Sequence, residues 1–275
     1  MKNLKLILIC CLISSYSFAS VTKNEKSALV ALYKSTHGTE WNTSWDLNAD
    51  VSTWFGVTVK NDNIVEINLQ FNNLQGELPN ELGSLRYLKI LNLGFNKISG
   101  KIPASLENLK DLKALVLFMN NLEGQIPSGI GQLKKIESIK LYGNKLTGNI
   151  PDSLMNLTNL KELLLSSNFL TGTIPVGIKS LKKLEKLGLM DNKMDGEIPA
   201  ELAQLDNLEE LLLSSNSFTG NLPVEFVNLA KLKTLMVSDN NLKQDYITVS
   251  GNRPQNLSNI IFHSNTAASI DIEKE

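Results

Sequence analysis

The chain has 275 residues, 42% of them hydrophobic, and its 27 basic and 28 acidic residues leave a net charge of −1. This balance gives no reason to expect nucleic acid or an anionic membrane as a partner, because both need a concentrated basic surface. Runs of lysine, such as Lys134-Lys135 and Lys182-Lys183, recur in the phase of other polar residues and indicate a solvated face. We therefore predict that nucleic acid is not a partner.

Residues 1–19 have the pattern of an export signal. Two lysines precede an apolar stretch at residues 6–13, and Ser17-Phe18-Ala19 supplies a small-x-small cleavage site. We predict that residues 1–19 are a cleaved signal peptide and that the protein is secreted, periplasmic or held at the cell surface. No later stretch reaches the roughly 20 apolar residues of a membrane span. Cys10 and Cys11 lie inside the signal, so the mature chain would have no disulfide.

Residues 20–63 differ in sequence pattern from the rest of the chain and are predicted to form an N-terminal cap. Apolar residues between positions 28 and 32 favour a short amphipathic helix. Aromatic side chains follow at Trp41, Trp45, Trp54 and Phe55. Next to a repeat region, such a cluster is most simply a shield for the open end of a core. A sugar-binding aromatic platform is the alternative interpretation.

One pattern then recurs every 24 residues along the chain. Each unit reads LxxLxLxxNxLxGxIPxxLxxL. Glycine and proline keep the same period, from Gly76 to Gly220 and from Pro79 to Pro223. The recurring asparagines are Asn72, Asn96, Asn120, Asn144, Asn168, Asn192, Asn216 and Asn240. A period of this kind predicts a solenoid, in which each coil buries its apolar face only against its neighbours.

The unit around Asn168 shows what each position does. Leu163 and Leu165 alternate with their neighbours, so they point inward from a short strand. The amide of Asn168 can both donate and accept, so stacked asparagines can satisfy the turn backbone of neighbouring coils. Gly172 permits the next bend and Pro175 fixes φ on the return path. The closing leucines return at helical or 3₁₀-like spacing.

These features predict an α/β solenoid with a parallel sheet of about nine strands on its concave side. The 24-residue repeats are predicted at 64–242, and a degenerate final repeat with a polar tail at 243–275. Residues 257–265 restore the LxxLxLxxN pattern for a ninth strand, so Asn265 is predicted to end the asparagine ladder.

The repeats resemble a known family. Units with Asn-x-Leu-x-Gly-x-Ile-Pro, as in residues 144–151, are similar to the plant-specific subclass of leucine-rich repeats, found in plant receptor-kinase ectodomains and polygalacturonase-inhibiting proteins. The resemblance covers residues 25–265, including Trp54-Phe55-Gly56-Val57-Thr58 in the cap. Ser52 and Val59 stand where the plant cap usually has cysteines, as in secreted bacterial relatives. The resemblance implies a right-handed superhelix that recognises a protein, peptide or carbohydrate on its concave sheet.

Outward-facing strand positions can be counted back from each asparagine. In the first four coils, apolar side chains occupy the positions one and two before it, and polar amides lie beside them. This candidate binding patch comprises Phe71, Phe95, Phe118, Met119 and Tyr142 with Asn68, Asn92 and Gln70. Contiguous exposed apolar patches tend to be interaction sites. The alternative is that the aromatic rings merely stack on one another to cover the sheet.

The sequence shows no arrangement of residues that is typical of a catalytic site. A glycosidase needs two carboxylates about 5–10 Å apart, and Lys186, one strand from both Glu162 and Glu210, would keep those two ionised. The two histidines, His37 and His263, lie at opposite ends of the solenoid. We predict no enzyme, no metal site and no cofactor. The alternating charges instead predict a ladder of attractive pairs across neighbouring strands.

The sequence thus predicts a secreted, non-catalytic recognition scaffold that binds a protein or peptide through the N-terminal half of its concave face. Two alternatives remain. A polysaccharide-binding adhesion protein is favoured by the amides beside the phenylalanines. An inhibitor of a foreign hydrolase is what the likeness to polygalacturonase-inhibiting proteins implies.

Overall fold

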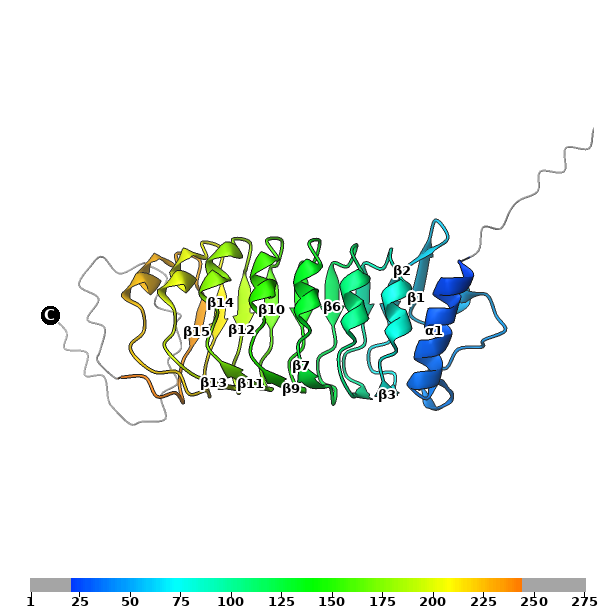
Figure 1. Cartoon of the computed structure of the whole chain (residues 1–275), viewed down its shortest axis with the longest axis horizontal. Helices are drawn as coiled ribbons and strands as arrows, with labels where there is room; N and C mark the ends of the chain where they lie inside the picture. The colour runs from blue at the N-terminus through cyan, green and yellow to red at the C-terminus, as the bar shows by residue number, and fades with distance from the viewer. Residues whose placement is uncertain (1–20, 244–275) are drawn as a thin grey trace, which may run out of the picture.

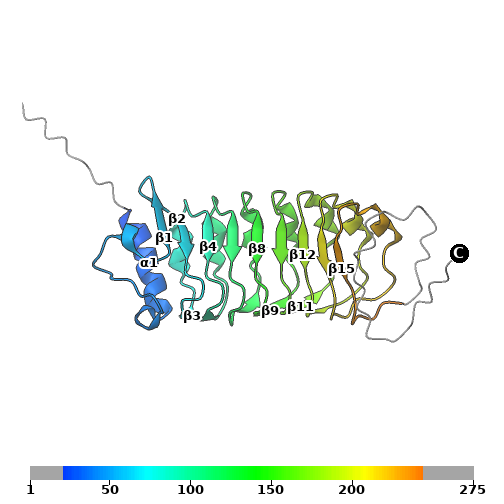
Figure 2. The same ribbon diagram turned by 180° about the vertical axis from the view of Figure 1, so that it is seen from behind.

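A computed structural model describes residues 21–243 of the chain. These residues form an elongated stack of coils, seen from its 3₁₀-helical face in Figure 1 and from its strand face in Figure 2. The predicted signal peptide at 1–19, the predicted ninth strand at 257–265 with Asn265, and His263 lie outside the described residues.

The stack begins with α1 (Lys23–Ser35), the amphipathic helix that the sequence predicts. Thr22 and Glu25 form a capping box that satisfies backbone groups at its start. The other carboxylate oxygen of Glu25 accepts a hydrogen bond from the backbone N–H of Ile64 at 3.2 Å. This buried contact joins the helix to the first repeat. Two short 3₁₀ helices follow, η1 (Gly38–Glu40) and η2 (Val51–Thr53).

The tryptophans form the interior of the cap. Trp41, Trp45 and Trp54 are only 3–5% exposed, and their rings contact one another at centroid distances of 4.7–4.8 Å. The indole N–H groups of Trp41 and Trp45 each donate to a backbone carbonyl at 2.8 Å. The predicted shielding role is confirmed for these three residues. The alternative sugar platform is wrong for them, because their ring faces are buried.

The main sheet has nine strands among the described residues. They are β1 (Val57–Lys60), β2 (Asn63–Asn68), β4 (Ile90–Asn92), β6 (Ala114–Val116), β8 (Ser138–Lys140), β10 (Glu162–Leu164), β12 (Lys186–Gly188), β14 (Glu210–Leu212) and β15 (Thr234–Met236), side by side in this order. The eight repeat strands are parallel, and each pairs in register with the equivalent residues of the next coil, as Glu162 does with Lys186. The remaining strand, β1, is antiparallel and comes from the cap, so the strand count agrees with the prediction through an element that the repeat pattern does not contain.

A second edge of each coil also carries short strands. One sheet contains β7 (Glu123–Gln125), β9 (Lys145–Gly148), β11 (Phe169–Gly172) and β13 (Lys193–Met194), and a smaller one contains β3 (Gln75–Glu77) and β5 (Lys97–Ser99). They lie along the lower edge of Figure 1. The sequence did not predict these strands.

The predicted 3₁₀ spacing of the return path is confirmed. Each 3₁₀ helix begins directly after the repeat proline: η3 (Asn80–Ser84), η4 (Ala104–Asn108), η5 (Ser128–Gln132), η6 (Asp152–Asn156), η7 (Val176–Ser180), η8 (Ala200–Gln204) and η9 (Val224–Asn228). The repeat leucines and isoleucines fill one continuous core between these helices and the sheet. In the part of the chain that the structure describes, no helix is both long and apolar enough to cross a membrane.

The predicted asparagine ladder is present in all eight described coils. Asn144 is 7% exposed, and its side-chain oxygen accepts from the N–H of Leu122 on the preceding coil at 3.0 Å. Its amide nitrogen donates to the carbonyls of Leu117 at 3.0 Å and Leu141 at 2.9 Å. Each side chain therefore bridges two coils. The first member, Asn72, bonds the backbone of Thr43 in the cap instead.

The ladder also fixes the backbone just before it. To reach the carbonyl three residues earlier, the asparagine side chain turns back over the end of its strand. The residue directly before the asparagine, which we call the pre-asparagine residue, has a left-handed backbone with φ of 51–67° in every described coil. These residues are Phe71, Phe95, Met119, Gly143, Ser167, Asp191, Ser215 and Asp239. Where this residue has a side chain, that side chain is exposed or partly exposed.

Removing one ladder member should weaken the whole stack. Asn144→Ala leaves the buried N–H of Leu122 without a partner and removes one of the two amide donors of the Leu117 and Leu141 carbonyls, which keep those of Asn120 and Asn168. We therefore expect the free energy of unfolding to fall by about 1–3 kcal/mol. Denaturant unfolding followed by circular dichroism measures the change. Asn121→Ala, at an exposed position, is the control and should cost less than about 0.5 kcal/mol. Equal effects of the two substitutions would contradict the structural role of the ladder.

Candidate binding surface

The predicted patch forms one continuous row of rings, which we call the aromatic ridge (Phe71, Phe95, Phe118 and Tyr142, with Met119 beside them). Phe71 stacks on Phe95 at a centroid distance of 4.3 Å, and Phe118 stacks on Tyr142 at 4.6 Å. Phe95 meets Phe118 edge to face at 5.1 Å. The residues come from the ends of four neighbouring strands, because the constant period of the repeat places them in register.

The ridge is less exposed than the sequence predicts. Phe71, Met119 and Phe95 are 58%, 44% and 41% exposed, but Phe118 is only 8% exposed. Its ring lies over Gly94, where an added Cβ would stand 2.7 Å from a ring carbon. The prediction that Phe118 is an exposed contact is wrong for this reason. Both sequence interpretations therefore hold in part: the rings cover one another, and three apolar side chains still face solvent.

The backbone of the exposed members is unusual. Phe71, Phe95 and Met119 are pre-asparagine residues with φ of 58°, 52° and 51°. Bulky side chains rarely adopt this conformation, which costs about 1–2 kcal/mol per residue. From the fourth coil onward the same position holds glycine, serine or aspartate. Sequence analysis missed this strain, although the switch from bulky to small and polar residues in this column was its visible signal.

Some polar side chains of the patch already form hydrogen bonds within it. The amide nitrogen of Asn92 donates to the side-chain oxygen of Gln70 at 3.0 Å, and the oxygen of Asn92 accepts from the N–H of Gly94 at 3.2 Å. Asn68 is exposed at the end of β2. Partial burial raises the pKa of Tyr142, so its hydroxyl stays neutral at ordinary pH. The ridge thus offers apolar area and few free polar groups.

The other half of the strand face is charged. One step of the predicted charge ladder is present, because Lys186 pairs with Glu210 at 2.7 Å. Glu162 pairs with Lys140 of the preceding strand at 2.9 Å. Partial burial raises the pKa of Glu162, but hydrogen bonds from Lys140 and Ser138 and the charges of Lys140 and Lys186 outweigh it and hold that pKa below its usual value. These contacts favour the ionised form of Glu162.

A metal site is likewise without support in residues 21–243. No three His, Cys, Asp or Glu side chains gather there closely enough to hold an ion. His37, the one histidine in that range, precedes η1 in the cap, far along the chain from Glu162 and Glu210.

Family comparison agrees with the geometry. A model described as "Leucine-rich repeat region" matches residues 67–171, and one described as "Leucine Rich Repeat" matches residues 207–229. The protein is a plant-type leucine-rich-repeat protein. None of the curated proteins matches this leucine-rich-repeat chain significantly.

Solved structures of plant receptors are similar. The ectodomain of the receptor kinase GASSHO1/SCHENGEN3 from Arabidopsis thaliana, in complex with CASPARIAN STRIP INTEGRITY FACTOR 2, is 33% identical with a TM-score of 0.74, over 79% of this chain and 27% of its own. The PEPR1–AtPEP1 complex is 31% identical with a TM-score of 0.76, over 88% and 34%. The Arabidopsis receptor kinase HAESA, in complex with the peptide hormone IDA and the co-receptor SERK1, is 30% identical with a TM-score of 0.55, over 80% and 46%. This leucine-rich-repeat chain spans less than half the length of each.

Two phenylalanines of the ridge should behave oppositely on truncation. Phe118→Ala removes a ring packed between two others and over Gly94, so we expect the free energy of unfolding to fall by about 2–4 kcal/mol. Phe71→Ala removes a largely exposed ring and should cost less than about 1 kcal/mol. Chemical denaturation of both variants measures the difference. A larger loss for Phe71→Ala than for Phe118→Ala would contradict the packing described here.

Proposed function

We propose that this protein is an exported, non-catalytic recognition scaffold whose aromatic ridge binds a peptide or an extended segment of a protein. The observation that carries the proposal is the conformation of Phe71, Phe95 and Met119. These three are apolar, substantially exposed and held in a left-handed backbone. Strained residues persist where the surrounding structure enforces them, and they are frequent at ligand-binding sites.

In other coils of the same chain, the pre-asparagine position holds residues that adopt a positive φ with less strain. Gly143, Ser167 and Asp191 occupy the pre-asparagine position in the next three coils. Glycine takes a positive φ without penalty, and aspartate tolerates it better than a bulky residue does. The stacking of Phe71 on Phe95 is a folding contact at this position, but it gives no reason for the exposed parts of these rings or for Met119. A contact made by the exposed side chains does give one, since aromatic residues and methionine are enriched at the centres of interfaces.

The stacking of the rings favours a peptide over an uncharged sugar. A sugar ring binds an aromatic residue by lying flat on an open ring face. In the ridge, the inner faces of both stacked pairs are occupied by another ring, at interplanar angles of 14° and 11°. Ring edges and the flexible thioether of Met119 remain, and they suit irregular apolar side chains of a peptide. A structural neighbour that holds a peptide hormone, HAESA, supports the same class of ligand.

Export and the lack of catalysis complete the proposal. The signal-like pattern at residues 1–19 supports secretion. The ion pairs of Glu162 with Lys140 and of Glu210 with Lys186 support a structural role for these carboxylates. A polysaccharide ligand remains the second candidate, favoured by the exposed amide of Asn68 next to the ridge.

Selection from a random-peptide display library on the immobilised chain tests the proposal. We expect enriched peptides rich in aromatic and aliphatic residues, whose affinity is then measured by calorimetry. The variant Phe71→Ser with Met119→Ser should bind such a peptide at least about tenfold more weakly, which corresponds to about 1.4 kcal/mol. Its melting temperature should stay within a few degrees of the unaltered chain, because serine already occupies this position in later coils.

The matched control removes exposed apolar side chains from the 3₁₀-helical face. Val176 and Val224 are 61% and 62% exposed, and Val176→Ser with Val224→Ser should leave peptide affinity unchanged. Equal binding by the ridge variant and the control variant would refute the ridge as the site. Failure to enrich any peptide, together with binding to an uncharged glycan array, would favour the polysaccharide alternative.

A further inference from the structure

The edge where the chain enters its strands carries a concentration of positive charge that the overall composition conceals. The relevant positions lie ten, nine and seven residues before each ladder asparagine, between a 3₁₀ helix and the next strand. From residue 86 to residue 185 these positions hold nine basic and three acidic side chains, although the whole chain has a net charge of −1. We call this strip the basic rim.

The period of the repeat aligns the charges. Lys110 and Lys134 stand at the same position of consecutive coils, and Lys182 stands there two coils further on. All three side chains are exposed. Neighbouring strands are about 4.8 Å apart, which is within the screening length of about 8 Å at physiological salt. The charges of adjacent coils therefore act together on anything that approaches the rim.

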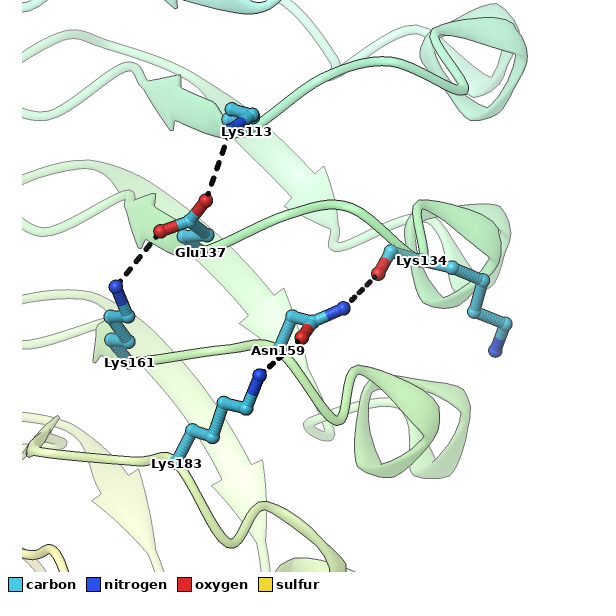
Figure 3. Close-up of polar contacts among 6 residues, drawn as sticks. All are labelled: Lys113, Lys134, Glu137, Asn159, Lys161 and Lys183. Carbon is cyan, nitrogen blue, oxygen red and sulfur yellow. Dashed lines mark hydrogen bonds and ion pairs between the residues drawn. The ribbon is translucent and has the colours of Figure 1, made fainter.

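Contacts along the rim leave much of this charge uncompensated. Lys183 donates to the side-chain oxygen of Asn159 at 2.8 Å, and the amide of Asn159 donates to the carbonyl of Lys134 at 2.9 Å (Figure 3). Lys110 bonds the neutral amide of Gln132 and Lys182 the carbonyl of Gln204. These neutral acceptors hold the lysine side chains in place without cancelling their charge.

The acidic residues of the rim lower its positive charge without changing its sign, and one of them, Asp111, pairs with Lys135 of the next coil. Glu137 is shared by two lysines, Lys161 at 3.0 Å and Lys113 at 3.4 Å, so the group of three keeps a net positive charge (Figure 3). Hydrogen bonds from Lys161 and Lys113 lower the pKa of Glu137. Acidic residues that balance the whole chain lie elsewhere, for example Glu81 and Glu107 in the 3₁₀ helices.

We propose that the basic rim binds a linear acidic polysaccharide, through carboxylate or sulfate groups spaced regularly along an extended chain. Like charges on neighbouring coils repel, so an anionic polymer laid along the rim relieves that repulsion. The coil spacing is comparable with the length of one sugar unit, which suits a regular polymer better than the irregular charges of a folded protein. Single-stranded nucleic acids are usually held by basic grooves with interleaved aromatic residues, whereas Tyr87 is the one aromatic residue at these positions. This second surface is independent of the aromatic ridge.

Binding to immobilised alginate and dextran sulfate, with uncharged dextran as blank, tests the proposal at low and physiological salt. The rim variant carries Lys134→Gln, Lys135→Gln, Lys182→Gln and Lys183→Gln. We expect its affinity to fall at least about tenfold, because four of the nine basic side chains of the rim are lost. Binding to alginate alone would identify carboxylate as the recognised group, and binding to dextran sulfate alone would identify sulfate.

An equal loss of charge on the opposite edge provides the control. Lys97, Lys101, Lys145 and Lys193 are exposed on the edge that carries β5, β9 and β13. Their replacement by glutamine should change affinity by less than about twofold, and raising the salt should weaken binding of the unaltered chain. Melting temperatures show that both variants fold. Equal losses in both variants, no binding of the unaltered chain to either polymer, or equally tight binding of single-stranded DNA would overturn the proposal.

Discussion

The interaction on which this structure depends is the hydrogen bonding of one buried or partly buried asparagine per coil. In a coil such as that of Asn144, a single amide accepts from the preceding coil and donates both to it and to its own strand. Apolar packing alone would let neighbouring coils slide, because leucines contact one another in many registers. Directional bonds to fixed backbone atoms set one register, and the constant period of the sequence is its consequence.

The same bonds create the site for binding. An asparagine that turns back over its strand forces the residue before it into the left-handed region, and the side chain of that residue then faces solvent. Ligand-binding side chains can therefore occupy the pre-asparagine positions without changing the packing of the core. In the first three coils the column carries Phe71, Phe95 and Met119, at a cost in backbone energy. In later coils it carries small or polar residues, and the strand face there is occupied by ion pairs such as Lys186 with Glu210.

Much of the fold could be predicted from the sequence because each repeat position has one dominant physical requirement. The ladder asparagines, the inward leucines such as Leu163 and the tryptophan cap follow from chemistry that is local or periodic. The antiparallel strand β1 could not be predicted, because Val57–Lys60 lies outside the repeat. The burial of Phe118 could not be predicted either, since it depends on the space above Gly94 on the preceding coil.

The total charge of the chain also fails to predict how charge is distributed over its surface. A net charge of −1 argues against a basic surface only if charges are mixed at random over the molecule. In a solenoid each sequence phase becomes one line on the surface, so Lys110 and Lys134 lie together while Glu107 belongs to a 3₁₀ helix. Counting charges by phase, rather than in total, would have found the basic rim. The aromatic ridge follows from the sequence in the same way, because its residues share one phase of the repeat.

We propose that ligand recognition belongs to the first four coils of the strand face. Hydrogen–deuterium exchange of the full chain, with and without a peptide selected on it, measures this most directly. We expect slower exchange at the ends of β2, β4, β6 and β8 and in the turns that follow, around Phe71, Phe95 and Met119. We expect no change at β12, β14 and β15. Protection confined to those later strands, or to the 3₁₀ helices, would contradict the proposal.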